Sequence, residues 1–359
     1  MAKTVKTMKA LVVYEKGKYV LEEAYPVPDL KEGEVLIRVE ACGVCASDVK
    51  NWHGAEGYWG DGTTEPWVKT PFIPGHEFIG EVVELSDNYH GTVKVGDRVT
   101  GEQIVPCGEC MFCQTGKYWM CDKADIFGFR EHVNGAMAEY MVLPAKTRIY
   151  QIPKELELEK AILIEPYSCA KHAIDRAQIT NTDVVVISGV GTLGLAMVNY
   201  ARLRNPKTLV AVDMIDSRLE IAKKFGADII LNPSKCNIED EVKKLTKGYG
   251  CDIYVEATGH PSSVQQGLDS IRKLGRFIEF SVFGQKVSVD WSVIGDGKEL
   301  DLLGSHLGPY CFDVVTDWIA DNTIYTDGVV THSFDLDHWK DAFEQNSKGE
   351  GSLKVIIKP

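Results

Sequence analysis

The sequence predicts an α/β protein with two domains, an all-β, barrel-like domain and a doubly wound parallel sheet with flanking helices. Two patterns support this fold class. Residues 8–150 contain short β-branched runs broken by glycine and proline, which is typical of all-β domains. From residue 183 onward, apolar strands alternate with helical segments, which indicates a parallel sheet covered by helices. A chain of 359 residues is long enough for two domains with sizeable cores.

The β-rich part carries two groups of residues with metal-binding or catalytic side chains. One group lies in "CGVCASDVKNWH" and the other in "PGHEFIGEVV". Neither group is a zinc signature alone, because a buried cysteine usually acts as a small hydrophobic residue and a lone histidine is usually structural. The candidate residues are Cys42, Cys45, Ser47, Asp48, His53, His76 and Glu77.

A third group is denser, because four of the ten cysteines fall within "CGECMFCQTGKYWMC". Their spacing is C-x2-C-x2-C-x7-C, and short loops of this kind fold four thiolates around one tetrahedral ion. Four sulfurs leave no open position for water, which describes a structural Zn²⁺ site. An iron–sulfur cluster is the alternative, although its usual run places the fourth cysteine after three residues and before proline. The four ligands are Cys107, Cys110, Cys113 and Cys121.

The strongest cofactor signal begins at a buried apolar strand, residues 183–188. "GVGTLG" follows at once and opens a helical pattern, as G-x-G-x-x-G does in dinucleotide sites. The first glycine permits a tight turn, the second lets a pyrophosphate approach the backbone, and the third lets the helix pack on the strand. The helix N-terminus adds free N–H groups. The residues of this turn that we assign to coenzyme binding are Gly189, Gly191, Thr192, Leu193 and Gly194.

A second strand supports the same cofactor. It covers residues 208–212 and ends at Asp213, nineteen residues after the last glycine of the motif. A carboxylate there can accept both ribose hydroxyls and would repel a 2′-phosphate, so the sequence favours NAD over NADP. Arg218 is close enough in the chain to leave NADP open. The alternation of helix and strand then continues through residues 218–226, 229–232, 238–248, 251–259, 263–275 and 276–284.

Composition argues against several function classes. The net charge of −13 is unsuited to a broad nucleic-acid surface and does not attract anionic membranes. The longest apolar runs are far too short to span a bilayer. The N-terminal stretch has neither the apolar region nor the cleavage site of a secretory signal. The sequence therefore predicts a cytoplasmic protein whose thiols stay reduced.

In their order along the chain, these pieces resemble the medium-chain, zinc-dependent alcohol and polyol dehydrogenases over essentially the whole length. The resemblance rests on "GVCASD", "GHEFIGEVVE", "VGDRVTGEQIVPCGECMFCQTGKYWMC", "GAMAEYMVLPA", the "EP" of Glu165 and Pro166, and the coenzyme fingerprint. It implies a GroES-like β-barrel catalytic domain, residues 1–156 and 298–359, and a Rossmann NAD-binding domain, residues 157–297.

The resemblance also implies roles for single residues. Cys45 and His76 match ligands of a catalytic zinc, and Asp48 matches a group that orients the histidine. Glu77 matches a carboxylate that ligates directly or lies close by. Glu165 stands where many alcohol dehydrogenases have a ligating cysteine and where the polyol branch has glutamate. Two zinc ions per subunit are expected, one catalytic and one structural.

The proton route is only partly implied. Ser47 matches the hydroxyl that receives the substrate proton, but the family's relay histidine is replaced here by Lys50. His53, or water near Glu165, offers another route.

A long aromatic segment separates Cys45 from His76. It either packs on its own body or lines the substrate pocket. Its large rings are Trp52, Tyr58, Trp59 and Trp67. Other residues that fall near the pocket in this family are Phe129, Arg130, Ser305 and His306.

The implied reaction is hydride transfer from a secondary hydroxyl of a sugar alcohol to NAD, giving a ketose. Glutamate at position 165 and the runs "CASDVKNWHGA" and "GEQIVPCGEC" look most like branches that act on erythritol or threitol. Longer alditols, other secondary alcohols, threonine, butanediol and inositol derivatives are alternative substrates. An NAD-sensing or structural relative is a different class, which the presence of the zinc ligands disfavours. Relatives are commonly homodimers or homotetramers.

Overall fold

The computed structural model describes residues 6–349 and 351–359, and the chain divides into two compact units. The second unit is inserted into the first along the chain. Its main segment begins at Pro166 and ends at Cys311, whereas the sequence predicted a domain of residues 157–297. The first unit comprises Met1–Glu165, Phe312–Asp321 and Thr326–Pro359, and the second comprises Pro166–Cys311 and Asn322–Tyr325.

The first unit is built around a seven-stranded sheet whose central strand is β3 (Val35–Val44). β3 pairs antiparallel with β4, β8 and β17, and the path through the sheet runs β16-β17-β3-β4-β5-β9. This arrangement confirms the predicted all-β domain. The other strands are β1 (Thr7–Glu15), β2 (Lys18–Pro26), β4 (Glu77–Leu85), β5 (Arg98–Gly101), β6 (Ile104–Val105), β7 (Asp125–Ile126), β8 (Tyr140–Leu143), β9 (Ile149–Gln151), β16 (Val330–Asp335) and β17 (Lys354–Lys358).

Short helices connect these strands. The longest of them, α11 (Trp339–Lys348), packs Trp339 and Phe343 into the apolar core of the sheet. The others are α1 (Ala46–Trp52), α2 (Glu56–Trp59), α3 (Met111–Gln114), η1 (Tyr118–Met120), α4 (Leu158–Ala161), α10 (Phe312–Ala320) and η3 (Leu336–His338). The helix α5 (Ile164–Ala177) begins in this unit and continues into the second.

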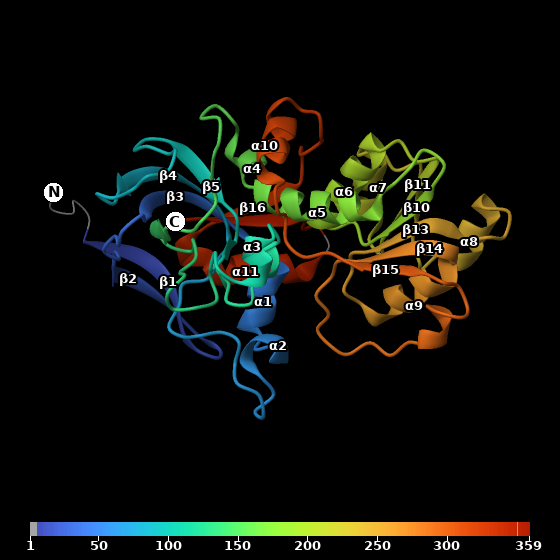
Figure 1. The fold of residues 1–359 in the computed structure, drawn as a ribbon, viewed down its shortest axis with the longest axis horizontal. Helices are drawn as coiled ribbons and strands as arrows, with labels where there is room; N and C mark the ends of the chain where they lie inside the picture. The colour runs from blue at the N-terminus through green and yellow to red at the C-terminus, as the bar shows by residue number, and fades with distance from the viewer. Residues whose placement is uncertain (1–5, 350) are drawn as a thin grey trace. The chain divides into compact units, whose positions relative to one another are not determined.

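The second unit contains a six-stranded parallel sheet with the order β12-β11-β10-β13-β14-β15. Helices α6 and α7 lie on one face of this sheet and α9 lies on the other (Figure 1). The strand order reverses between β10 and β13, which is where dinucleotides bind in such sheets. The elements are β10 (Val184–Ser188), α6 (Thr192–Leu203), β11 (Thr208–Val212), α7 (Asp216–Lys224), β12 (Ile229–Leu231), α8 (Ile238–Leu245), β13 (Cys251–Glu256), α9 (Pro261–Ser270), β14 (Ile271–Glu279), η2 (Trp291–Val293) and β15 (Asp301–Gly304).

This sheet confirms the predicted doubly wound fold, with one local difference. The helix predicted over residues 263–275 ends at Ser270. Ile271 already pairs with Cys251 of the neighbouring strand, so sheet pairing takes over before the apolar helical pattern ends. The strand that follows ends at Glu279 rather than at residue 284.

Within the described part of the chain, no helix is long and apolar enough to cross a membrane.

Candidate metal centres and coenzyme site

The four clustered cysteines lie in a small lobe that contains α3 and η1. Cys107 Sγ is 4.0 Å from Cys113 Sγ, and Cys110 Sγ is 3.7 Å from Cys121 Sγ. Four sulfurs at about 2.3 Å from one Zn²⁺ stand about 3.8 Å apart, because they mark the corners of a tetrahedron. The donor set therefore fits one tetrahedral ion, whereas a cluster of several irons would hold its thiolates farther apart.

Backbone N–H groups from the same lobe point at these sulfurs. The N–H of Cys107 donates to Cys121 Sγ, and the N–H of Cys110 donates to Cys107 Sγ, both at 3.3 Å. Hydrogen bonds of this kind favour the thiolate form. The N–H of Glu109 lowers the pKa of Cys107, and the N–H of Cys113 lowers the pKa of Cys110 to about 6. Both thiols are thus predisposed to hold a cation.

The second group of ligands is assembled by strand pairing. β3 and β4 run antiparallel with Gly43 opposite Glu77, which places Cys45, just beyond β3, beside His76, just before β4. The ligand atoms of Cys45, His76 and Glu77 lie within 4.8 Å of one another. A Cβ on Gly43 would come within 2.1 Å of Glu77 Oε2, so only glycine leaves space for this carboxylate.

Buried polar atoms without partners surround this group. Asp48 Oδ1 lies 3.9 Å from His76 Nδ1, and neither atom has a hydrogen-bond partner among the described residues. The other oxygen of Asp48 accepts the N–H of Cys45 at 2.9 Å, which fixes the carboxylate at the start of α1. The ring of His76 therefore directs one nitrogen toward Asp48 and leaves the other for an ion.

The charges at the site favour a bound cation. Burial by itself lowers the pKa of His76, but the negative charge of Asp48 and then the Cys45 sulfur outweigh it and raise that pKa to about 10. Burial raises the pKa of Asp48, and the His76 charge opposes this shift. A field that holds a proton on His76 also attracts a divalent ion, so this donor set fits Zn²⁺.

Glu77 has a partner that the sequence did not reveal. The ammonium group of Lys354 in β17 donates to both carboxylate oxygens of Glu77, at 2.6 and 2.8 Å, and also to the carbonyl of Val44 at 3.3 Å. Lys354 and Glu77 are only 4% and 2% exposed. Burial tends to lower the pKa of Lys354, but Glu77 outweighs it and raises that pKa. The only sequence signal was a lysine within the apolar run "KVII".

Glu165 lies in the first turn of α5 and is buried. Its Oε1 accepts a hydrogen bond from Gln103 Nε2 at 2.5 Å, a partner that the sequence also did not indicate. Among the described residues, Glu165 does not belong to the group whose ligand atoms lie within 4.8 Å of one another. The charge of Glu165 nevertheless contributes to the raised pKa of His76 and of Lys354.

The three candidate proton carriers differ in exposure. The Oγ of Ser47 is buried and has no partner within the described chain. Lys50 is half-buried on α1, and burial lowers its pKa. His53 follows α1, is exposed, and packs against Trp52 with 4.7 Å between ring centres.

The aromatic residues between Cys45 and His76 divide into two sets. Trp52 packs against Trp339 and Phe343 of the core, with ring centres 6.0 and 5.7 Å away. Tyr58 and Trp67 instead contact Phe129, whose ring lies 5.7 Å from that of His76.

Further contacts place the remaining pocket candidates. Trp59 donates from its indole to the carbonyl of Asn51 at 2.9 Å. Arg130 lies over the ring of Trp67 at 5.2 Å. In the second unit, the N–H of Ser305 donates to the carbonyl of Glu279 at 2.9 Å, and burial lowers the pKa of His306.

The glycine-rich turn of the second unit follows β10 and leads into α6. Gly189 has a φ of 92°, and a Cβ there would lie 2.8 Å from the carbonyl oxygen of Ala257. A Cβ on Gly194 would lie 1.8 Å from the carbonyl oxygen of Gly189, so only glycine permits this approach of helix and turn. A Cβ on Gly191 would meet nothing closer than Arg218 at 3.9 Å, which leaves room for a ligand.

A hollow of about 520 Å³ adjoins this turn at the carboxyl ends of the strands. Its lining includes Gly191, Asp213 and Arg218, whereas Thr192 and Leu193 form the half-buried first turn of α6. The two oxygens of Asp213 accept the N–H groups of Val190 and Ile215, each at 2.9 Å. The structure thus brings together the acidic and basic residues that bear on the choice between NAD and NADP.

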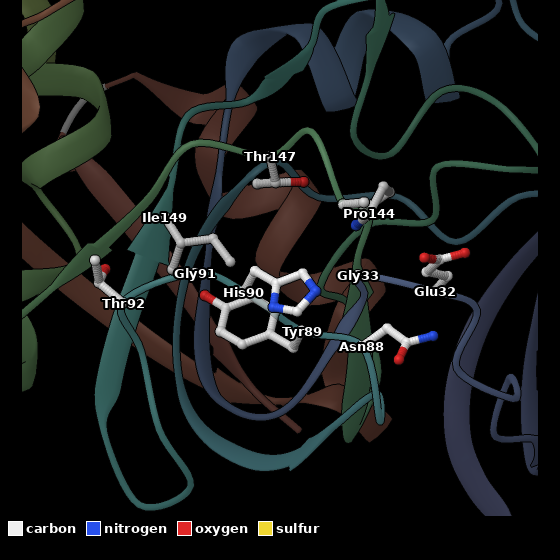
Figure 2. A pocket seen from close by; sticks show the side chains of 11 residues that line it. Glu32, Gly33, Asn88, Tyr89, His90, Gly91, Thr92, Pro144, Thr147 and Ile149 are labelled. Atoms are coloured by element: carbon white, nitrogen blue, oxygen red, sulfur yellow. The ribbon is translucent and has the colours of Figure 1, made fainter.

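Another hollow, of about 650 Å³, lies elsewhere on the first unit. Figure 2 shows its lining, which includes Glu32, His90 and Thr147. Glu32 is the one carboxylate among the lining residues, and neither ligand group found in the described chain belongs to this hollow.

Comparisons with known proteins identify the family of this chain. The family model described as the alcohol dehydrogenase GroES-like domain matches residues 31–154, and the one described as zinc-binding dehydrogenase matches residues 192–321. An erythritol/L-threitol dehydrogenase of Mycolicibacterium smegmatis is 46% identical over 354 residues, which cover 98% of each chain.

Solved structures show the same fold. An alcohol dehydrogenase of Escherichia coli CFT073 complexed with NADH is 28% identical, with a TM-score of 0.86 over 99% of this chain and 100% of that one. A protein of Sinorhizobium meliloti 1021 described as a zinc-binding dehydrogenase, bound to NADP, is 27% identical, with a TM-score of 0.88 over the same shares.

The chain therefore belongs to the zinc-dependent alcohol and polyol dehydrogenases of the medium-chain type, and it is an oxidoreductase. Within that family it is similar to the erythritol/L-threitol dehydrogenase. The expected GroES-like and Rossmann folds are confirmed.

Proposed function

We propose that this protein is an NAD-dependent zinc enzyme that oxidises a secondary hydroxyl of a short sugar alcohol, such as erythritol or threitol, to a ketose. The observation that carries the proposal is the close approach of Cys45 and His76, whose ligand atoms lie within 4.8 Å of each other and of a Glu77 carboxylate oxygen. The similarity to an erythritol/L-threitol dehydrogenase at 46% identity supports the substrate class.

We assign two zinc ions to each subunit. The four-cysteine lobe holds the structural ion, and Cys45 and His76 hold the catalytic one. Because Glu77 is already neutralised by Lys354, we assign direct ligation to Glu165 and charge balance to Glu77. When bound, Zn²⁺ supplies a Lewis acid that lowers the pKa of the substrate hydroxyl toward neutrality.

The electron pair and the proton leave the substrate by separate routes. The C–H bond breaks with its electron pair, which goes as hydride to C4 of the nicotinamide, and this requires a separation of about 3–3.5 Å. The O–H proton passes to Ser47 Oγ, which is buried and has no partner in the described chain, and Ser47 releases its own proton toward solvent. Alcohol and NAD⁺ thus give ketone, NADH and one proton.

The choice of NAD depends on Asp213. Each of its oxygens accepts one backbone N–H and retains a lone pair for a ribose hydroxyl. A 2′-phosphate beside this carboxylate would be repelled, although Arg218 lines the same hollow. A strong preference for NADP in coenzyme kinetics would show that this role of Asp213 is wrong.

Two further properties are proposed from composition and family alone. We expect a cytoplasmic enzyme and a homodimer or homotetramer, to be checked by fractionation and by light scattering.

The experiment that tests the function is an NAD-linked absorbance screen over alditols of three to six carbons, with metal analysis of the same protein. Turnover of four-carbon alditols with two zinc ions per subunit supports the proposal. Turnover of simple primary alcohols alone would exclude the polyol assignment. One zinc ion per subunit and no turnover would indicate a non-catalytic relative.

A further inference from the structure

Tyr58 stands out among the aromatic residues between Cys45 and His76. It lies in α2 and is half-buried. Its ring stacks on that of Phe129, with centres 5.5 Å apart and planes 11° from parallel. The ring of Phe129 lies 5.7 Å from that of His76. Tyr58 is therefore separated from a proposed zinc ligand by a single ring.

The backbone around Tyr58 is held in place. The N–H groups of Trp67 and Val68 both donate to the Tyr58 carbonyl, at 2.9 and 3.2 Å, so the far end of the segment folds back on α2. The ring of Trp67 meets that of Tyr58 edge-on at 6.1 Å and that of Phe129 at 5.2 Å. Stacking and backbone bonds together fix the direction of the phenol.

The hydroxyl of Tyr58 has no hydrogen-bond partner in the described chain. Burial, and then the negative charges of Cys45 and Asp48, raise the pKa of Tyr58. Tyr58 Oη is not among the fully buried atoms that lack a partner, so it is accessible to solvent and open to a ligand.

We propose that Tyr58 determines substrate specificity by hydrogen bonding to a hydroxyl of the polyol that does not react. This inference rests on the proposed function, because it assumes that a polyol binds at the Cys45 and His76 centre. In this proposal the packed rings of Tyr58, Trp67 and Phe129 limit the length of the bound carbon chain. The phenol strengthens the binding of substrates that carry a second hydroxyl, because it forms a hydrogen bond with that group. A site that offers such a partner discriminates against analogues that lack the hydroxyl.

The test compares Tyr58→Phe with the unaltered enzyme on two four-carbon substrates. Erythritol carries additional hydroxyls, whereas 2-butanol carries only the one that reacts. We expect kcat/KM for erythritol to fall about tenfold, the effect of losing one hydrogen bond, while kcat/KM for 2-butanol stays within about twofold. Tyr14→Phe is the matched control, because Tyr14 loses only a surface bond to Glu22 on the β1–β2 hairpin.

Binding gives a readout that does not depend on turnover. In calorimetry of the enzyme–NADH complex, the erythritol dissociation constant of Tyr58→Phe should rise by the same factor, with zinc content and melting temperature unchanged. Equal losses on erythritol and 2-butanol, or a lowered melting temperature, would show a structural role and overturn the inference, as would unchanged erythritol binding. If the unaltered enzyme neither binds nor oxidises polyols, the proposed function itself fails and takes this inference with it.

Discussion

The two groups of candidate metal ligands in the first unit are built in opposite ways. The four-cysteine lobe takes its donors from residues 107–121, and backbone N–H groups of that same stretch bond to its sulfurs. The other group joins Cys45, His76 and Glu77, which meet because β3 pairs with β4. Buried polar atoms beside it have no partners in the described chain. A closed site satisfies its own polar atoms, whereas a site for chemistry leaves some of them for an ion and a substrate.

We expect the largest effect from a substitution that removes one ligand from the group of Cys45, His76 and Glu77. Cys45→Ser replaces a thiolate with a much poorer zinc ligand, so we expect zinc to fall from two ions per subunit to one. Loss of the Lewis acid should lower kcat/KM on the order of a thousandfold, with little change in melting temperature. Plasma mass spectrometry and steady-state kinetics measure both effects. Cys236→Ser, in the second unit, is the control and should change neither.

The corresponding change in the lobe should act on stability instead. Cys110→Ser opens the tetrahedral site, and loss of a structural ion should destabilise the first unit by about 3–5 kcal/mol. Urea unfolding with metal analysis measures this. Subunits that stay folded should retain most of their kcat. If Cys110→Ser abolished turnover without changing stability, the contrast between the two sites would be wrong.

A third substitution removes Lys354, the counter-ion of Glu77 in the group of Cys45, His76 and Glu77. Lys354→Met keeps the side-chain length but leaves the Glu77 carboxylate buried and unpaired, which should cost about 3 kcal/mol of unfolding free energy. Urea midpoints report the loss. The double variant Lys354→Met with Glu77→Gln should recover most of it, because no charge then remains uncompensated. Failure of the double variant to recover stability would show that Lys354 acts through packing.

The second unit offers an uncompensated carboxylate at a place without metal ligands. Glu279 lies directly opposite Glu256 in the parallel pair β13–β14, and its Oε1 is buried without a partner in the described residues. Burial, and then the charge of Glu256, raise the pKa of Glu279 to about 7. The folded protein therefore keeps a proton that an unfolded glutamate releases near pH 4.3.

The sign of the pH dependence follows. Stability from this group is complete below about pH 4.3 and is lost as the pH rises toward 7. Glu279→Gln should abolish this decline and make the protein more stable than the unaltered chain by about 1 kcal/mol at pH 8, allowing for the partial exposure of Glu279. Urea midpoints at pH 5 and pH 8 measure the difference. Glu220 is an exposed residue of α7 and serves as the control. The difference in urea midpoint between Glu220→Gln and the unaltered chain should be the same at pH 5 and pH 8.

How much could be predicted from the sequence depended on how local each feature is. The strand, glycine turn and helix around Gly189 are contiguous, as is the four-cysteine lobe, so spacing and residue type were enough to place them. Lys354 and Gln103 were missed because their partners Glu77 and Glu165 are brought to them by the folded sheet and not by the chain.

The aromatic segment shows the same limit at shorter range. Its composition predicted packing on the body of the protein or a place in the pocket, and the alternatives could not be separated by residue type. The structure divides the rings, with Trp52 against Trp339 in the core and Tyr58 against Phe129 near His76. The hydrophobicity of a ring does not indicate which residue it contacts. The path of the backbone through α1 and α2 sets those contacts.

The bond between Lys354 and Glu77 has a consequence for synthesis on the ribosome. The two residues are 277 positions apart, and the whole second unit is made between them. At a synthesis rate of about 5–20 residues per second, roughly 15 to 55 seconds pass between the addition of Glu77 and the addition of Lys354. During that interval β3 has no β17 beside it and the carboxylate lacks this cation, so these two contacts of the first unit form only after translation has passed residue 354. A chaperone that shields this half-built sheet would act in that interval, and stalled chains that end before residue 354 should be readily degraded.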